Sequence, residues 1–173
     1  AERGSSHGGS DHAAAIATRD AVLIADSGRA AVATVPSLRP HGLRNAKILG
    51  TDLWNIDGSL ASSSTMYGAW FASVSDTLYN QYATKYRARF GRAPLRLSSL
   101  GYDSVLLVAR VARDWRPGSK FPVSQLTDPQ GFIGVDGAFR FMANGLTERM
   151  LEVQEIQAGK FVTIDPAPTA FAK

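Results

Sequence analysis

Hydrophobic residues in the first part of the chain come in short continuous runs, each followed by polar residues and glycine. Residues 21–25 and 46–50 are such runs. We expect each to form a central strand of a parallel sheet, because a strand buried on both faces needs no polar alternation. Between them, Ser27 is expected to cap a helix that reaches about Leu38 and that Pro36 kinks or interrupts. The pattern predicts a right-handed β-α-β unit.

The middle of the chain predicts a third strand followed by an amphipathic helix. Residues 68–73 are expected to form the strand, after a Ser-rich surface loop at 59–65. A large apolar residue at every fourth position from Leu78 to Phe90 predicts a helix whose tyrosines pack in the core. Gly91 is expected to end it, because glycine accepts the left-handed conformation found after a helix C-terminus.

A second helix follows and is more apolar than the first. It is expected to begin at a cap formed by Ser98 or Ser99 and to reach about Trp115. Apolar residues surround most of its circumference, which is typical of a helix that is buried on more than one side.

The last third of the chain changes to alternating strands and tight turns. Asp136-Gly137 is a turn signal before the alternating run 139–141, and residues 151–157 and 160–164 predict a hairpin. The order of elements predicts an α/β fold with open, mainly parallel sheets flanked by helices and with antiparallel strands at the C-terminal end.

Composition narrows the class of protein. The 173 residues include no cysteine, which excludes disulfide scaffolds and thiolate metal sites, and no apolar run is long enough to cross a membrane. Residues 1–19 are Gly/Ser-rich, and we expect a flexible segment without a metal site. The net charge is +4, with basic residues clustered from Lys85 to Arg116. We interpret this cluster as a solvated helix face, because no nucleic-acid-binding motif accompanies it.

Catalytic signatures are scarce. No G-x-S-x-G motif occurs from residue 20 onwards, and His41 is the last histidine of the chain. The glycines of 131–137 lead into a strand, whereas a phosphate-binding loop opens a helix. The sequence therefore predicts a protein that is not an enzyme and that uses no cofactor and no metal. A cytosolic doubly wound enzyme remains an alternative, which an activity lost on substitution of Asp52 or Tyr102 would support.

Two polar loops follow the predicted parallel strands. Asp26 and Ser27 follow the first strand, and Thr51, Asp52 and Trp54 follow the second. Ligands of open α/β sheets bind outside the carboxyl ends of the strands, so we expect these residues to contact a small polar ligand. The alternatives are that Asp26 and Ser27 only cap a helix and that Trp54 only closes the edge of the core.

Several segments together resemble a known family. Lys-Ile-Leu-Gly-Thr at 47–51, Tyr-Arg-Ala-Arg-Phe-Gly-Arg-Ala-Pro at 86–94, Gly-Tyr-Asp-Ser-Val-Leu-Leu at 101–107 and the run 128–141 are similar to the C-terminal half of type 1 periplasmic binding proteins. These are the Leu/Ile/Val-binding-like substrate-binding proteins of ABC transporters. The resemblance runs from about residue 20 to 164, and within the family the chain looks most like the penicillin-binding protein activators.

The resemblance implies two lobes joined by a hinge, with a ligand between them, and it adds Tyr102 to the ligand-binding residues. The divisions it implies are a flexible segment 1–19, a domain 20–165 with 20–67 and 128–165 mostly in one lobe and 68–127 mostly in the other, and a tail 166–173.

Two functions follow from this resemblance. The first is a periplasmic solute-binding protein for an amino-acid-like ligand, lipid-anchored or free, that delivers its ligand to an ABC permease. The second is a regulator of peptidoglycan synthesis that acts by contact with a cell-wall synthase. In both cases we expect a missing N-terminal half, a second chain or self-association to cover apolar edges, and we expect no nucleic-acid partner and no transmembrane segment.

Overall fold

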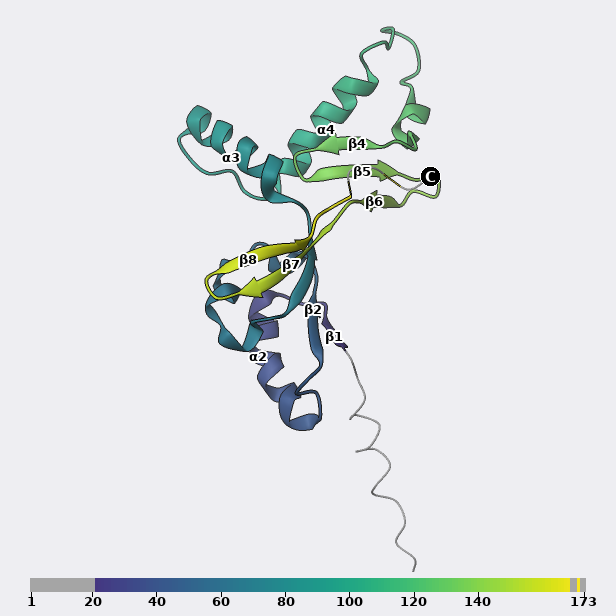
Figure 1. The fold of residues 1–173 in the computed structure, drawn as a ribbon. Helices are drawn as coiled ribbons and strands as arrows, with labels where there is room; N and C mark the ends of the chain where they lie inside the picture. The colour runs from purple at the N-terminus through teal and green to yellow at the C-terminus, as the bar shows by residue number, and fades with distance from the viewer. Residues whose placement is uncertain (1–20, 169–170, 172–173) are drawn as a thin grey trace, which may run out of the picture. The chain divides into compact units, whose positions relative to one another are not determined.

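A computed structural model describes residues 21–168 and residue 171 (Figure 1). The expected flexible segment 1–19 and part of the expected tail lie outside the described residues. The chain forms two compact units. The first contains the described residues up to Phe71 together with Gln154–Val162, and the second contains Ala72–Val153 and the residues from Thr163 onwards. The chain therefore passes between the units three times.

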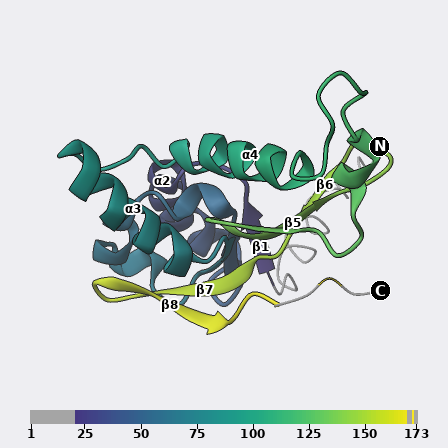
Figure 2. The same cartoon turned by 90° about the horizontal axis from the view of Figure 1, so that it is seen from above.

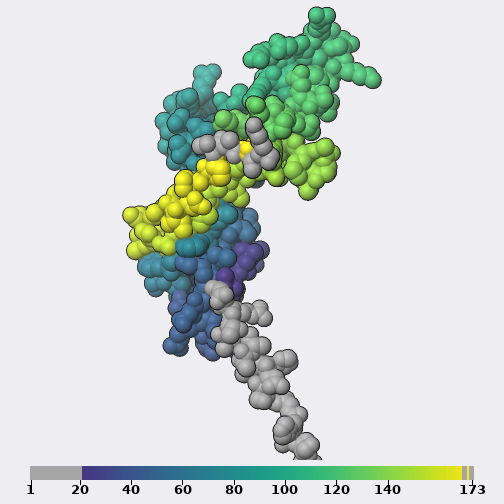
Figure 3. Space-filling view, turned by 45° about the vertical axis from the view of Figure 1, so that its right-hand side comes forward, coloured from purple at the N-terminus to yellow at the C-terminus, as the bar shows by residue number. Residues whose placement is uncertain are grey.

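The first unit is built on a five-stranded sheet with the order β1-β2-β3-β7-β8. Its strands are β1 (Ala21–Ile24), β2 (Lys47–Gly50), β3 (Trp70–Ser73), β7 (Glu152–Gln157) and β8 (Lys160–Asp165). The first three are parallel, with Val22 beside Ile48 and Leu49 beside Trp70. β7 and β8 form the predicted hairpin, and β8 lies at the surface (yellow in Figure 3).

Helix α2 (Gly28–Leu38) connects β1 to β2 and supplies one side of the core. Ser27 caps it as predicted, accepting a hydrogen bond from the Ala30 N–H at 3.3 Å. Pro36 does not interrupt the helix, which continues to Leu38. It lies in the last turn of α2, so its missing N–H removes only one backbone hydrogen bond. This bond is close to the C-terminal end of the helix, and helix ends fray.

The Ser-rich segment is not a simple surface loop. It forms two 3₁₀ helices, Gly58–Ser62 and Ser64–Met66, and it buries Leu60 and Met66 completely. The core of the first unit consists of these two side chains with Ala31, Val35, Trp54, Ala69, Phe71 and Ile156. An isolated apolar residue among serines has no periodicity, so the sequence pattern did not reveal Leu60 as part of this core.

A polar cluster joins three strands of the first unit. The Trp70 Nε1–H donates to a Glu155 carboxylate oxygen at 2.9 Å, and Gln157 donates to the other oxygen at 3.0 Å. The Lys47 ammonium lies 4.0 Å from the centre of the Trp70 ring and donates to the Gly68 carbonyl at 2.9 Å. These hydrogen bonds, that from Trp70 first, lower the pKa of Glu155 from its ordinary value of 4.5.

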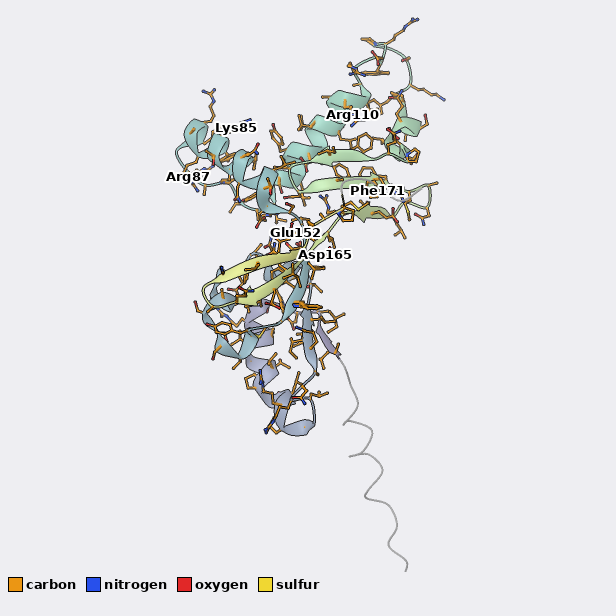
Figure 4. The ribbon with its side chains drawn as sticks, in the orientation of Figure 1. Lys85, Arg87, Arg110, Glu152, Asp165 and Phe171 are labelled. Carbon is orange, nitrogen blue, oxygen red and sulfur yellow. The ribbon has the colours of Figure 1, made fainter. Side chains whose placement is uncertain are left out.

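The second unit combines the helices α3 and α4 with a small antiparallel sheet (Figure 2). Helix α4 contacts β4. Its elements are α3 (Asp76–Phe90), α4 (Ser98–Val111), β4 (Phe132–Gly134), β5 (Gly137–Phe141) and β6 (Thr147–Arg149). Its core is Val111 with Phe132 and Phe139. The Arg140 guanidinium lies 4.5 Å from the ring centre of Phe171, so this aromatic residue near the C-terminus packs on β5 (Figure 4).

A buried polar network fixes the β4–β5 turn to the start of α4. The Asp103 carboxylate accepts the Val135 N–H at 2.8 Å. Asp136 pairs with Arg96 at 2.9 Å and accepts the Ser99 hydroxyl. Since these carboxylates are almost inaccessible to water, the fold depends on the hydrogen bonds that compensate their burial.

This network explains why the start of α4 differs from the prediction. Ser98 and Ser99 lie within the first turn, and neither caps the helix, since Ser99 bonds to Asp136 instead. The helix ends at Val111, because Trp115 turns back and packs on Phe121 at 5.9 Å between ring centres.

The fold class is confirmed, with parallel strands β1–β3 followed by antiparallel strands. The structure groups the chain differently from the expected lobes, because residues 128–153 belong to the second unit. The reason is that Phe132 and Phe139 pack against Val111 of α4. No α3 residue is buried, so the stripe from Leu78 to Phe90 is not core among the described residues.

Candidate functional site

The first part of the candidate site is the turn between β1 and α2. An Asp26 carboxylate oxygen accepts the Ser27 N–H, and the Ser27 hydroxyl caps α2. The predicted capping role is therefore present. It leaves both side chains exposed beside the positive end of the helix dipole, where a ligand with negative charge is favoured.

The second part is the 3₁₀ turn Asp52–Trp54 that follows β2. Trp54 is fully buried, and its Nε1–H donates to the Asp26 carbonyl at 2.9 Å. Its ring packs against Gly50, where an added Cβ would lie 2.4 Å from the ring atoms. The indole therefore connects the two turns that follow β1 and β2. Ligand contact and closure of the core edge were the two roles considered for Trp54, and the structure shows closure of the core edge.

Thr51, at the end of β2, carries an unusual hydroxyl. Its Oγ1 is buried and has no hydrogen-bond partner among the described residues. An unpartnered buried hydroxyl costs about 1–3 kcal/mol, so such groups are rare in folded proteins unless something else satisfies them. Asp52 beside it is exposed.

Asp57 is a site residue that sequence reasoning missed. Its carboxylate accepts the N–H of Ser59 at 3.2 Å, and the other carboxylate oxygen would lie 2.8 Å from a Cβ on Gly28. Glycine at the first turn of α2 therefore allows this carboxylate to approach the helix. The Asp-Gly-Ser order at 57–59 is the signal that could have revealed the capping turn.

Next to this carboxylate is an open polar pocket of about 450 Å³ within the first unit. It is lined by Arg29, Val32, Asp57, Ser59, Ser62 and Ser63. One cation, one carboxylate and three hydroxyls offer complementary contacts to a small molecule that carries both an acidic and a basic group.

The structure therefore brings together five of the predicted residues, Asp26, Ser27, Thr51, Asp52 and Trp54, on the two turns after β1 and β2. Tyr102 belongs to the second unit, on α4, where its ring lies 5.0 Å from that of Tyr82. Its part in ligand binding stays a prediction.

Metal-binding side chains do not gather in the described part of the chain. There the structure contains no group of three or more His, Asp or Glu side chains that could hold a metal ion. His41 is exposed near the C-terminal end of α2, with its Nδ1 2.9 Å from the Ser37 carbonyl oxygen. Among residues 21–168 and 171, no helix is long and apolar enough to span a membrane.

Comparisons with known proteins give a likeness in structure. No family model matches the sequence, and no curated protein matches it. A Rhodospirillum rubrum protein assigned to a branched-chain amino acid ABC transporter matches with a TM-score of 0.70 at 19% identity, over 84% of this chain and 44% of that one.

Two further solved structures show the same fold. The substrate-binding protein LivJ of Streptococcus pneumoniae, in complex with isoleucine, matches with a TM-score of 0.54 at 25% identity, over 86% of this chain and 45% of that one. The C-domain of LpoA from Haemophilus influenzae, a regulator of PBP1A, matches with a TM-score of 0.56 at 18% identity, over 84% and 44%. The chain spans less than half the length of each of these three proteins.

Proposed function

The chain has the fold of about half of a type 1 periplasmic binding protein, as its motifs predicted, and from this premise we propose that it binds a small polar ligand as part of an extracytoplasmic solute-binding protein. The proposed ligand is amino-acid-like, and the proposed recipient is an ABC permease. The protein works by binding and release and carries out no catalysis.

The observation that carries the proposal is the Thr51 hydroxyl at the carboxyl end of a parallel strand. It is buried without a partner among the described residues, in the turn that the Trp54 indole links to the Asp26 carbonyl before α2. A ligand that accepts or donates a hydrogen bond there removes the cost of the unpaired group, and that gain appears as affinity.

The test is a Thr51→Val substitution, measured on the longest natural polypeptide that contains this chain. We expect affinity for the bound amino acid to fall about tenfold in calorimetric titration, since one hydrogen bond is worth about 1.4 kcal/mol. We expect the free energy of unfolding without ligand to stay the same or rise, because the substitution removes an unsatisfied buried group.

The matched control is Thr34→Val on the exposed face of α2, whose hydroxyl bonds to the Ala30 carbonyl within the same helix. It should leave affinity unchanged. Equal effects of the two substitutions, or no binding of any amino acid or small peptide, would count against the proposal.

A second function is supported by one observation, the likeness to the LpoA C-domain. In that case the chain would act by contact with a cell-wall synthase, with the polar pocket empty. If the calorimetric titrations detect no ligand binding and the protein binds a purified peptidoglycan synthase saturably, the regulatory function is favoured over transport.

A further inference from the structure

The polar pocket beside α2 contains two opposite charges that do not pair with each other. Arg29 and Asp57 both line this pocket of about 450 Å³, and none of the ion pairs between described residues joins them. Two opposite charges that are held apart in one pocket are complementary to a small molecule that carries both charges.

The position of Arg29 is not explained by the stability of the helix. Arg29 is exposed in the first turn of α2, where the helix dipole disfavours a positive charge. Its guanidinium forms no hydrogen bond to a described residue. A guanidinium binds a carboxylate through two parallel N–H bonds, and the hydroxyl of Ser62 in the same lining can add a third donor.

Asp57, in contrast, is fixed by its own turn. Its Oδ1 accepts both the N–H and the hydroxyl of Ser59. Its Oδ2 lies against the first turn of α2, 2.8 Å from the position of a Cβ on Gly28, and accepts no hydrogen bond from a described residue. A carboxylate that is held through one oxygen keeps the other available for an ammonium group.

We infer that this pocket binds the charged head group of a free α-amino acid, with the ligand carboxylate on Arg29 and the ligand ammonium on Asp57. This inference rests on the proposed function and names the class of its ligand. Val32 is the one apolar residue among the six that line the pocket. A branched apolar side chain would gain little from this lining, because the hydrophobic effect requires apolar surface on both sides. The pocket therefore favours a small polar amino acid such as serine.

The experiment is a set of calorimetric titrations on the same protein as the Thr51→Val test. The probes are L-serine, L-serinamide, which has no carboxylate, N-acetyl-L-serine, which has no ammonium, and L-leucine. We expect each of the last three to bind about tenfold more weakly than L-serine or worse, because each loses one favourable contact with the pocket.

Substitutions then assign each charge of the ligand to one residue. Arg29→Gln should weaken L-serine binding about 10- to 100-fold and leave the weak binding of L-serinamide unchanged, since the amide has no carboxylate to lose. Asp57→Asn should weaken L-serine binding by a similar factor and leave N-acetyl-L-serine unchanged. The asparagine amide oxygen can still accept the Ser59 N–H, and urea unfolding checks that this variant remains folded.

Each substitution has a matched control. Arg39→Gln removes a cation at the other end of α2. Asp128→Asn changes a carboxylate that accepts the Gln130 N–H at 2.9 Å, in a turn of the same kind as that of Asp57 and Ser59. Both controls should leave the affinity for L-serine unchanged.

Four outcomes would overturn the inference. They are no binding of L-serine, tighter binding of L-leucine than of L-serine, L-serine binding that neither Arg29→Gln nor Asp57→Asn weakens, and an equal loss of affinity in the controls. If the two substitutions act as expected and Thr51→Val has no effect, the inference stands while the proposed function loses its supporting observation. Amino-acid binding that depends on Thr51 but not on Arg29 or Asp57 would have the opposite meaning.

Discussion

The candidate site depends on single residues at the ends of β1 and β2. The Trp54 indole can pack against Gly50 of β2 only because residue 50 has no side chain. This contact places the Nε1–H on the Asp26 carbonyl and so holds the two turns together. The arrangement of the two turns therefore depends on a glycine at the end of β2.

Gly50→Ala should lower the free energy of unfolding by about 1–3 kcal/mol, because its Cβ would overlap the buried indole. Gly58→Ala is the matched control, since a Cβ there meets nothing within 4 Å. It should be neutral or stabilising by up to about 1 kcal/mol. Urea unfolding measures both, and equal effects would mean that Trp54 does not pack as described.

Asp136 illustrates a different dependence, on buried charge. Asp136→Asn removes the charge that pairs with Arg96 in a nearly inaccessible turn. We expect stability to fall by about 1–3 kcal/mol, because the remaining polar groups lose a charged hydrogen-bond partner.

Asp114→Asn is the control for Asp136→Asn. Its contact with Arg113 is 3.7 Å long and highly exposed, so we expect a change within about 0.5 kcal/mol in the same unfolding measurement. A loss at Asp114 as large as that at Asp136 would contradict the role given to burial.

At the scale of elements, the contact between β3 and β7 introduces a dependence on pH. The pKa of Glu155 is lowered in the folded state, chiefly by the Trp70 hydrogen bond. A lowered pKa contributes stability that is complete above the ordinary value of 4.5 and that is lost as the pH falls through the folded value. Acid should therefore weaken this contact.

The measurement is an NMR titration of the Glu155 carboxyl group, combined with unfolding at about pH 6 and about pH 3.5. Trp70→Phe should raise the pKa of Glu155 toward 4.5 and reduce the difference in stability between the two pH values. Trp115→Phe, which removes an indole donor to the Ser119 carbonyl, should leave the titration unchanged. A Glu155 titration that is the same in all three proteins would contradict this assignment.

At the scale of the whole molecule, the chain contains two separate cores. The first is centred on Leu60 and Phe71 and the second on Phe132 and Phe139, and they share no residue. Three passages of the chain connect the two units. This organisation predicts that stability can be changed in one unit at a time.

Leu60→Ala should cost about 2–5 kcal/mol and speed amide exchange in β2, with little change in β5. Phe139→Ala should cost about 3–5 kcal/mol and do the reverse. Hydrogen exchange followed by mass spectrometry distinguishes them. Equal acceleration in both units by either substitution would show that they unfold as one.

Local pattern determined much of this protein. The runs at 21–25 and 46–50 became parallel strands, Ser27 became a helix cap and Gly91 a helix end, because strand burial and capping depend on residues that are close in the sequence. The motifs around Phe90 and Tyr102 indicated the fold through their resemblance to a known family.

Contacts between distant residues were decided only by the tertiary structure. Leu60 lies in the core although its segment is rich in serine, and the Asp57 carboxylate lies against the first turn of α2. Ser99 does not cap α4 as expected but bonds to Asp136, 37 positions away. None of these contacts between distant residues has a local signature. Each depends on where the folded chain brings a second group, since the free energy of a buried apolar or polar side chain is set by its neighbours in space.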